Sequence, residues 1–347
     1  MTLLQGKAGW GLLIALALVF PYVVPNNYFL SVMTLSYIFA IAALGLNLIT
    51  GYTGQFNLAH GGFMAIGAYA VGLLTTDYQW GFWWAFAAAG ALCGVLGWLT
   101  GMLSLRMTGH VFSIFTLCVG YIIYLLIEKW EAVTHGAVGV MGIPAPAHPF
   151  GGEVDTPIGQ YYLMLGFLVL GAVVMQRIVR SILGRSFMAV RNGEALAEAL
   201  GIPLMRTKRL AFVLSVIYAG LAGGLYAGHV RFLGPELAAT HHTFELVMFM
   251  LVGGIGTLFG PILGSVLVPW LTQSLQFLQD YRMVVFGPLL IVLLIFLPHG
   301  IVGTWLHRQA RREAAKRAQA APAAPPVSAP PVSPPPVSAP RTGARHA

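Results

Sequence analysis

Charged side chains are scarce in this chain of 347 residues. The 19 Lys or Arg and 11 Asp or Glu side chains make up 9 % of the sequence, whereas charged residues make up about 25 % of ordinary soluble domains. Hydrophobic residues make up 57 %, and the mean hydropathy is +0.77. A soluble globule could not bury that much apolar surface. The scarcity of charge therefore excludes a soluble fold and indicates a membrane protein.

The charge-free runs are long enough to cross a bilayer. No Asp, Glu, Lys or Arg lies between Lys7 and Asp77. Further charge-free runs cover residues 78–105, 107–127, 156–176, 210–230, 246–279 and 283–307. Because a membrane helix needs about 20 apolar residues, we predict an all-α polytopic membrane protein with about ten transmembrane helices. The predicted spans are 10–25, 28–49, 56–76, 82–105, 110–127, 160–178, 210–229, 244–256, 259–279 and 283–304.

Cysteines and catalytic motifs are scarce too. Cys93 and Cys118 both fall within predicted spans, so we expect neither a disulfide framework nor a metal site. The sequence has no P-loop, no GxGxxG before a helix, no HExxH and no GxSxG. We therefore expect no enzyme activity and no cofactor.

The formal net charge of +8 has a simple explanation in membrane topology. Basic residues mark cytoplasmic loops, and a cytoplasmic N-terminus places 16 Lys or Arg inside and 3 outside. This split requires residues 246–279 to form two short segments hinged at 253–256. We therefore expect both termini in the cytoplasm and no nucleic-acid partner.

Two regions follow from composition. Residues 1–306 form the predicted transmembrane domain, with a cytoplasmic loop at 180–209. Residues 307–347 form a basic and then Pro/Ala-rich tail, in which 308–317 could lie on anionic lipid. Residues 322–340 hold 9 of the 21 prolines, which favours a disordered segment.

The carboxylates lie at or beyond the ends of the predicted spans. Proton-coupled carriers usually need an acidic or His relay inside the membrane, so we expect the energy for transport to enter from elsewhere. Sodium coupling through backbone carbonyls stays open as an alternative.

The cytoplasmic loop points to a place where energy could enter. Residues 185–200 can form one helix, which Gly201 would end and Pro203 would prevent from continuing. Such a helix is either a docking element for a soluble partner or an inert amphipathic connector. The candidate contact residues are Arg185, Arg191, Glu194, Glu198 and Gly201.

Small residues supply close packing where charges are missing. Two glycine triplets have the four-residue spacing that lets membrane helices approach closely. They are Gly220, Gly224 and Gly228, and Gly256, Gly260 and Gly264.

Glycines also surround a polar cluster between residues 51 and 62. Gln55, Asn57 and His60 lie there, and Asn47 precedes them on the second span. Their side chains need partners within a bilayer. Either they tie a broken helix to its neighbours or they line the substrate path, and we favour the structural tie.

Several runs resemble one family of membrane permeases. They are GLNLITGYTGQFNLAHGGFMAIGAYAVGLL (45–74), GRSFMAVRNGEALAEALGIPLMRTKRLAFVLSVIYAGLAGGLYA (184–227) and LVGGIGTLFGPILGSVL (251–267). They resemble the inner-membrane permeases of branched-chain amino acid ABC importers. The pieces 106–109, 112–117 and 134–144 resemble the LivM-type subunit more than its LivH-type partner.

The resemblance implies an assembly. We expect a type II-like importer fold in the bacterial inner membrane, paired with a LivH-type permease, two separate ABC ATPase subunits and a periplasmic substrate-binding protein. The segment 185–201 would be the coupling helix. An ion-coupled carrier of small polar solutes remains the alternative, as does an ABC permease for urea, amides or aromatic amino acids.

One departure concerns the fifth predicted span. Family members often carry a Glu and an Arg three residues apart where this chain has Tyr121 and Tyr124. The two tyrosines either border the pathway and shift substrate preference toward aromatic or other apolar amino acids, or they form a repacked helix contact.

Overall fold

The computed structural model describes residues 15, 17–23, 26–107, 109–146, 156–274, 300–305 and 308–309. The chain divides into two units, Met1–Leu306 and His307–Ala347, and every element below belongs to the first. Half of the first predicted span, most of the last one and nearly all of the tail lie outside the described residues.

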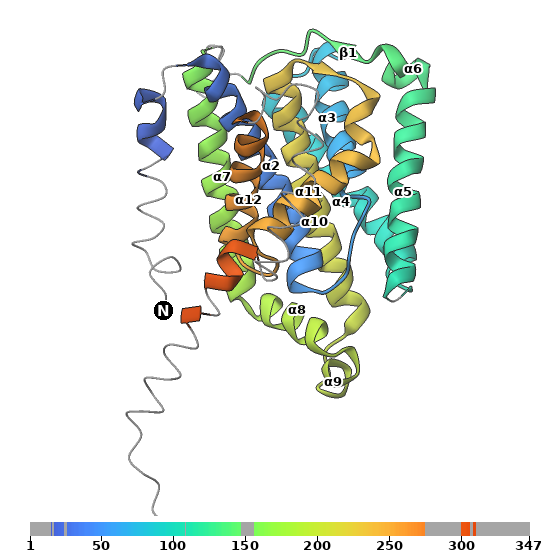
Figure 1. Cartoon of the computed structure of the whole chain (residues 1–347). Helices are drawn as coiled ribbons and strands as arrows, with labels where there is room; N and C mark the ends of the chain where they lie inside the picture. The colour runs from blue at the N-terminus through green and yellow to red at the C-terminus, as the bar shows by residue number, and fades with distance from the viewer. Residues whose placement is uncertain are drawn as a thin grey trace, which may run out of the picture. The chain divides into compact units, whose positions relative to one another are not determined.

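The described part is almost entirely helical (Figure 1). A π-helical turn, Leu48–Tyr52, extends α2. The long helices are α2 (Asn27–Asn47), α3 (His60–Thr76), α4 (Phe82–Ser104), α5 (His110–Lys129), α7 (Pro157–Arg180), α10 (Leu204–Val230), α11 (Thr240–Gly253) and α12 (Phe259–Ser274). They correspond to the second through ninth predicted spans, and the predicted all-α polytopic class is confirmed.

Short elements connect these helices. At one end of the bundle lie α6 (Glu131–Thr134), the 3-10 turns Gly136–Val138 and Pro235–Ala238, and an antiparallel pair of strands. The strands are β1 (Val140–Met141) and β2 (Phe232–Leu233). At the other end lie α8 (Ile182–Asn192) and α9 (Glu194–Ala199).

Polar residues define where two of the long helices begin. The Asn26 side chain accepts a hydrogen bond from the Tyr28 amide at the start of α2. The Thr156 hydroxyl accepts one from the Gly159 amide at the start of α7, where Pro157 occupies the first turn. Both residues satisfy amide groups that have no partner within the helix.

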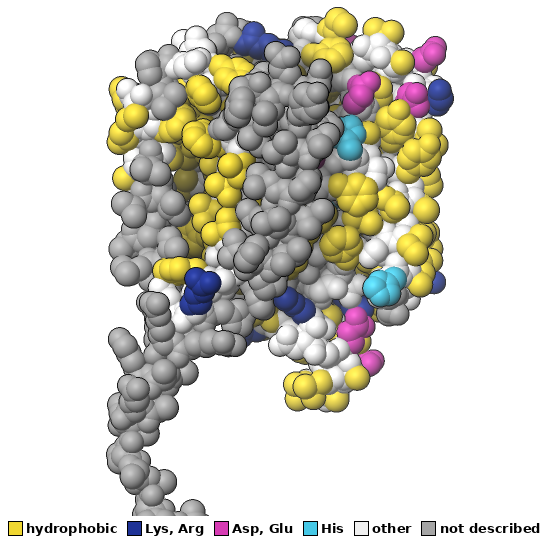
Figure 2. Space-filling model, in the orientation of Figure 1, with side chains coloured by type: hydrophobic (Ala, Val, Ile, Leu, Met, Phe, Trp, Pro, Cys, Tyr) yellow, Lys and Arg dark blue, Asp and Glu magenta, His cyan; other side chains and the backbone are white. Residues whose placement is uncertain are grey.

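Helices α2, α3 and α10 form the core of the bundle, and α2 and α10 are the most buried of the candidate membrane spans. In their most apolar stretches, 72 % and 67 % of the residues are buried, against 28 % for α4, α5 and α7. Five segments in the described residues are long and apolar enough to cross a membrane, namely α2 with its π turn, α4, α5, α7 and α10. The exposed sides of α4, α5 and α7 are apolar, as lipid contact requires. Figure 2 shows charged side chains toward the two ends of the bundle, with hydrophobic side chains between them.

Glycines allow α10 to contact its neighbours directly. A Cβ added at Gly223 would overlap the backbone of Met64 on α3. A Cβ at Gly220 would overlap Cys93 of α4. Gly224 and Gly228 face Phe86 and Phe82, also on α4. The first predicted triplet therefore lies where α10 packs against α4.

The second triplet is not one helix face, and this part of the prediction is wrong. Gly256 lies between α11 and α12 with φ +72, a left-handed conformation that favours glycine. Gly260 contacts the turn at Gly254, and Gly264 contacts the backbone of Phe249 on α11. The hinge expected at 253–256 is observed, since α11 ends at Gly253 and α12 begins at Phe259.

The loop 180–209 also differs from the prediction of one helix over 185–200. Gly193 adopts φ 174 and ψ 111, an extended conformation that separates α8 from α9. The loop therefore holds two short helices.

We predict that Gly223→Ala destabilises the bundle by about 1–3 kcal/mol, because the added methyl group overlaps backbone that cannot move away. Gly166→Ala on α7 is the matched control, since no described residue lies within 4 Å of the added carbon. Helix propensity alone favours alanine at both sites. Thermal unfolding of the purified protein measures the difference, and equal midpoints for the two variants would contradict the packing argument.

Candidate functional site: the junction between the α8–α9 loop and the bundle

The end of α2 is joined to the turn between α11 and α12 by one side chain. Asn47 donates from Nδ2 to the Thr257 carbonyl at 2.8 Å, and its Oδ1 accepts from the Gly256 amide at 2.8 Å. Only 1 % of Asn47 is exposed. A Cβ added at Gly51 would overlap the Asn47 amide, so Gly51 leaves the space that this side chain occupies.

Arg191 of α8 joins the same place from outside the bundle. Its guanidinium donates a hydrogen bond to the Gly51 carbonyl. Its side chain also passes close to Gly54 and Gly256, where a Cβ would contact it. Arg191 therefore packs between the segment that follows α2 and the turn that follows α11.

A buried ion pair connects α9 to α10. Lys208 Nζ lies 2.7 Å from Glu194 Oε1, and the Lys208 side chain is only 2 % exposed. The same carboxylate oxygen accepts a hydrogen bond from Gln55 Nε2 at 3.2 Å. Burying an ammonium group is unfavourable unless a counter-charge meets it. The position of Glu194 is therefore set by Lys208.

Helix α9 ends in a Schellman motif. The Ile202 amide donates to the Ala197 carbonyl at 3.0 Å, the Gly201 amide donates to the Glu198 carbonyl at 2.9 Å, and Gly201 has φ +81. Ala197 is buried against the protein. Leu196 and Leu200 are 67 % and 71 % exposed, and the Glu198 side chain is exposed beside them. Helix α9 lies at the end of the bundle (Figure 1), and both of its leucines are exposed there.

Asn57 and His60 contact neighbouring backbone and helices. Asn57 Oδ1 accepts from the Ala59 amide at 3.0 Å, while its Nδ2 is buried and has no hydrogen-bond partner in the described part of the chain. His60 Nε2 donates to the Ala42 carbonyl of α2 at 2.8 Å, and Nδ1 lies 3.4 Å from the Ser215 hydroxyl of α10. His60 thus joins α3 to α2 and α10, whereas the Asn57 bond stays within its own loop. The structural tie favoured from the sequence stays a prediction.

The two tyrosines of α5 lie apart from this junction. Tyr121 and Tyr124 stack with ring centroids 6.0 Å apart, and Tyr121 is 52 % exposed. Arg185, also expected at the coupling site, lines a pocket between α7, α8 and the turn that precedes α12. Among the described residues, no group of three His, Cys, Asp or Glu side chains could hold a metal ion.

The junction includes residues that the sequence did not reveal. In the sequence, Lys208 is one of many basic residues predicted to be cytoplasmic. Its partner Glu194 lies on the other side of the turn at Gly201, so no local pattern pairs the two residues. Gly51 and Gly54 belong to the glycine-rich polar segment seen in the sequence, and the structure shows that they make room for Asn47 and Arg191.

Comparison with known proteins identifies the class. Residues 28–294 match the family described as the permease component of branched-chain amino acid transport systems. LivM of Escherichia coli K12, named as a high-affinity branched-chain amino acid permease protein, is 31 % identical over 312 residues, covering 84 % of this chain and 73 % of LivM. LivH of Salmonella typhimurium is 24 % identical, covering 80 % of this chain and 96 % of LivH.

A third relative has a different named substrate. The autoinducer 2 import permease protein LsrC of Enterobacter sp. strain 638 is 31 % identical over 281 residues, covering 76 % of this chain and 78 % of LsrC. No solved structure matches this chain. The helical bundle is that of a polytopic membrane permease. The chain belongs to the branched-chain amino acid transport permease family and is an ABC importer permease. The resemblance seen in its sequence is therefore confirmed.

We predict that Asn47→Ala lowers the free energy of unfolding by about 2 kcal/mol or more, because the Gly256 amide and the Thr257 carbonyl both lose a buried partner. Asn192→Ala is the control, since the Asn192 side chain is exposed at the end of α8. Unfolding midpoints of the two purified variants measure the effect. A midpoint for Asn47→Ala equal to that of the control would show that the bridge adds no stability.

Proposed function

We propose that this chain is the LivM-type permease subunit of an ATP-driven importer of branched-chain amino acids. The match to LivM covers a larger share of this chain than the match to LsrC, at equal identity. In this proposal the chain forms half of the translocation path, a LivH-type permease forms the other half, and a periplasmic binding protein delivers the substrate. The chain itself is not an enzyme, because hydrolysis takes place on two partner ATPase subunits.

The single observation that carries the coupling role is the exposed, anchored helix α9. Its outer side presents Leu196 and Leu200 with Glu198, while its first residue is held by the buried Lys208. An inert connector needs no such anchor. Exposed apolar side chains on a helix that is held in place are suited to contact with a protein partner. We therefore propose that the ATPase docks on α9. Arg191, Glu194 and Gly201 hold the helix in place.

The electrostatics of the described bundle favour an external energy source. None of the Asp or Glu side chains within the described residues is fully buried. The ion-coupled alternative would require a buried titratable relay or an ion site. His60 is buried, but both of its ring nitrogens face helix partners.

The topology follows from the basic residues. Arg177, Arg180, Arg185 and Arg191 lie on α7 and α8 near the end that carries α9, which supports a cytoplasmic position for that end. We propose a location in the bacterial inner membrane with both termini in the cytoplasm. We further propose that residues 1–306 are the permease domain and 307–347 a dispensable tail.

We predict that Leu196→Ser combined with Leu200→Ser leaves the permease folded but lowers co-purified ATPase at least about fivefold and abolishes uptake, since two exposed leucines contribute about 1 kcal/mol or more each to a contact. Met205→Ser, at an exposed position at the start of α10, is the control. Normal ATPase recovery and normal uptake in the double variant would exclude α9 as the docking helix.

Substrate class has its own test. We expect uptake of labelled leucine by the complete system in proteoliposomes to require ATP and to be inhibited by unlabelled isoleucine and valine. Phenylalanine and urea should inhibit little. ATP-independent uptake driven by an ion gradient would contradict the importer, and preference for phenylalanine or urea would contradict the proposed substrate.

A further inference from the structure

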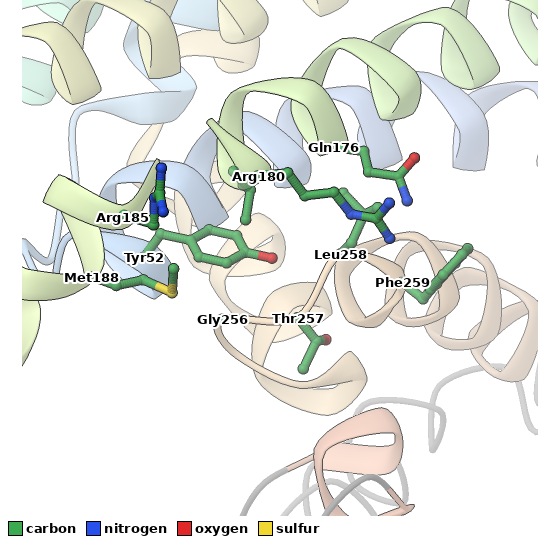
Figure 3. Close-up of a pocket in the computed structure, with 10 residues that line it drawn as sticks. Tyr52, Gln176, Arg180, Arg185, Met188, Gly256, Thr257, Leu258 and Phe259 are labelled. Atoms are coloured by element: carbon green, nitrogen blue, oxygen red, sulfur yellow. The ribbon is translucent and has the colours of Figure 1, made fainter. Parts of the chain in front are cut away.

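A pocket of about 390 Å³ opens where the end of α7 meets α8 and the turn before α12 (Figure 3). It lies beside the coupling junction but uses different side chains. Its lining residues are Tyr52, Gln176, Val179, Arg180, Arg185, Met188 and residues 256–259.

The pocket has an unbalanced positive charge. Among the described residues that line it, Arg180 and Arg185 are the charged ones, and none is an Asp or Glu. Neither guanidinium has a hydrogen-bond or ion-pair partner among the described residues. Arg191, which lies on α8 with Arg185, differs from both because its guanidinium donates to the Gly51 carbonyl. Two free guanidinium groups beside one cavity are suited to a phosphate, whose oxygens match their paired donors.

Tyr52 adds a hydrogen-bond donor to this pocket. Only 6 % of Tyr52 is exposed, and its hydroxyl has no hydrogen-bond partner among the described residues. Figure 3 shows its ring extending into the pocket between Arg185 and Leu258. The ring is buried while the hydroxyl reaches the open space of the pocket. It can therefore donate to an oxygen atom of a ligand bound beside Arg185.

The remaining lining indicates an amphiphilic ligand. Val179, Met188, Leu258 and Phe259 are apolar, which a small soluble anion would not need. Beside the pocket on α8, Ile182 is 73 % exposed and Leu183 is 44 % exposed. The apolar helix α7 ends at Arg180, where the hydrocarbon layer gives way to headgroups in the proposed topology.

We propose that this pocket binds the phosphate of an anionic phospholipid headgroup from the cytoplasmic leaflet. Arg180 and Arg185 pair with the phosphate, the Tyr52 hydroxyl donates to a headgroup oxygen, and the acyl chains lie against the apolar side chains. The lipid would then bridge α7, α8 and the turn that Asn47 holds.

The test measures lipid binding to the purified full-chain protein by native mass spectrometry. Phosphatidylglycerol and phosphatidylcholine with identical acyl chains are compared, and inorganic phosphate forms a third arm. We expect phosphatidylglycerol to bind about tenfold more tightly than phosphatidylcholine. Arg180→Gln with Arg185→Gln should weaken phosphatidylglycerol binding about tenfold or more, because each basic residue near anionic lipid contributes about fivefold.

Arg177→Gln is the matched control, since Arg177 lies on the same helix without lining the pocket. Its phosphatidylglycerol affinity should stay within about twofold of the parent protein. An equal loss of phosphatidylglycerol affinity in this control would show that general surface charge causes the effect, and it would overturn the proposed site. Displacement of the lipid by millimolar inorganic phosphate, with phosphate binding equally tightly alone, would identify free phosphate as the ligand and overturn the lipid assignment.

Tyr52→Phe keeps the ring and removes only the hydroxyl. It should weaken phosphatidylglycerol binding two- to fivefold with an unchanged unfolding midpoint. This variant also decides the outcome if the double arginine variant fails to fold. Unchanged affinity in Tyr52→Phe would then contradict the proposed site.

Discussion

The buried ammonium group of Lys208 is the constraint on which the end of this permease that carries α8 and α9 depends. With 2 % of its side chain exposed, it requires a counter-charge, and Glu194 meets it at 2.7 Å. Glu194 is the first residue of α9, so the pair fixes that helix against α10. Without this pair, a six-residue helix bounded by Gly193 and Gly201 would have little to hold it in place.

From this pair, contacts continue into the membrane domain. Gln55 shares the Glu194 carboxylate and belongs to the segment between α2 and α3. Arg191 reaches the Gly51 carbonyl in the same segment, and Asn47 joins the end of α2 to the turn between α11 and α12. A displacement of α9 would therefore act on α2 and α10, the most buried of the five candidate membrane spans in the described residues. Such a connection is what a subunit driven by an external ATPase requires.

The sequence predicted those features that depend on composition along the chain. Charge-free runs located the spans, and clustered glycines located the hinge after Gly253. The prediction of one helix over 185–200 was wrong because Gly193 is extended, and glycine spacing alone could not show that. The Asn47 bridge joins residues 209 positions apart. No local pattern specifies such a contact, because it depends on how separate helices pack.

The most direct test of this account is a double-mutant cycle on the buried pair, read as substrate imported per ATP hydrolysed by the reconstituted system. Glu194→Gln leaves the Lys208 charge buried and unpaired, whereas Glu194→Gln with Lys208→Met removes both charges. The account predicts that Glu194→Gln lowers the coupling ratio severalfold and that adding Lys208→Met restores much of it. Unchanged coupling in Glu194→Gln, or a double variant that is worse by the sum of both single effects, would contradict it.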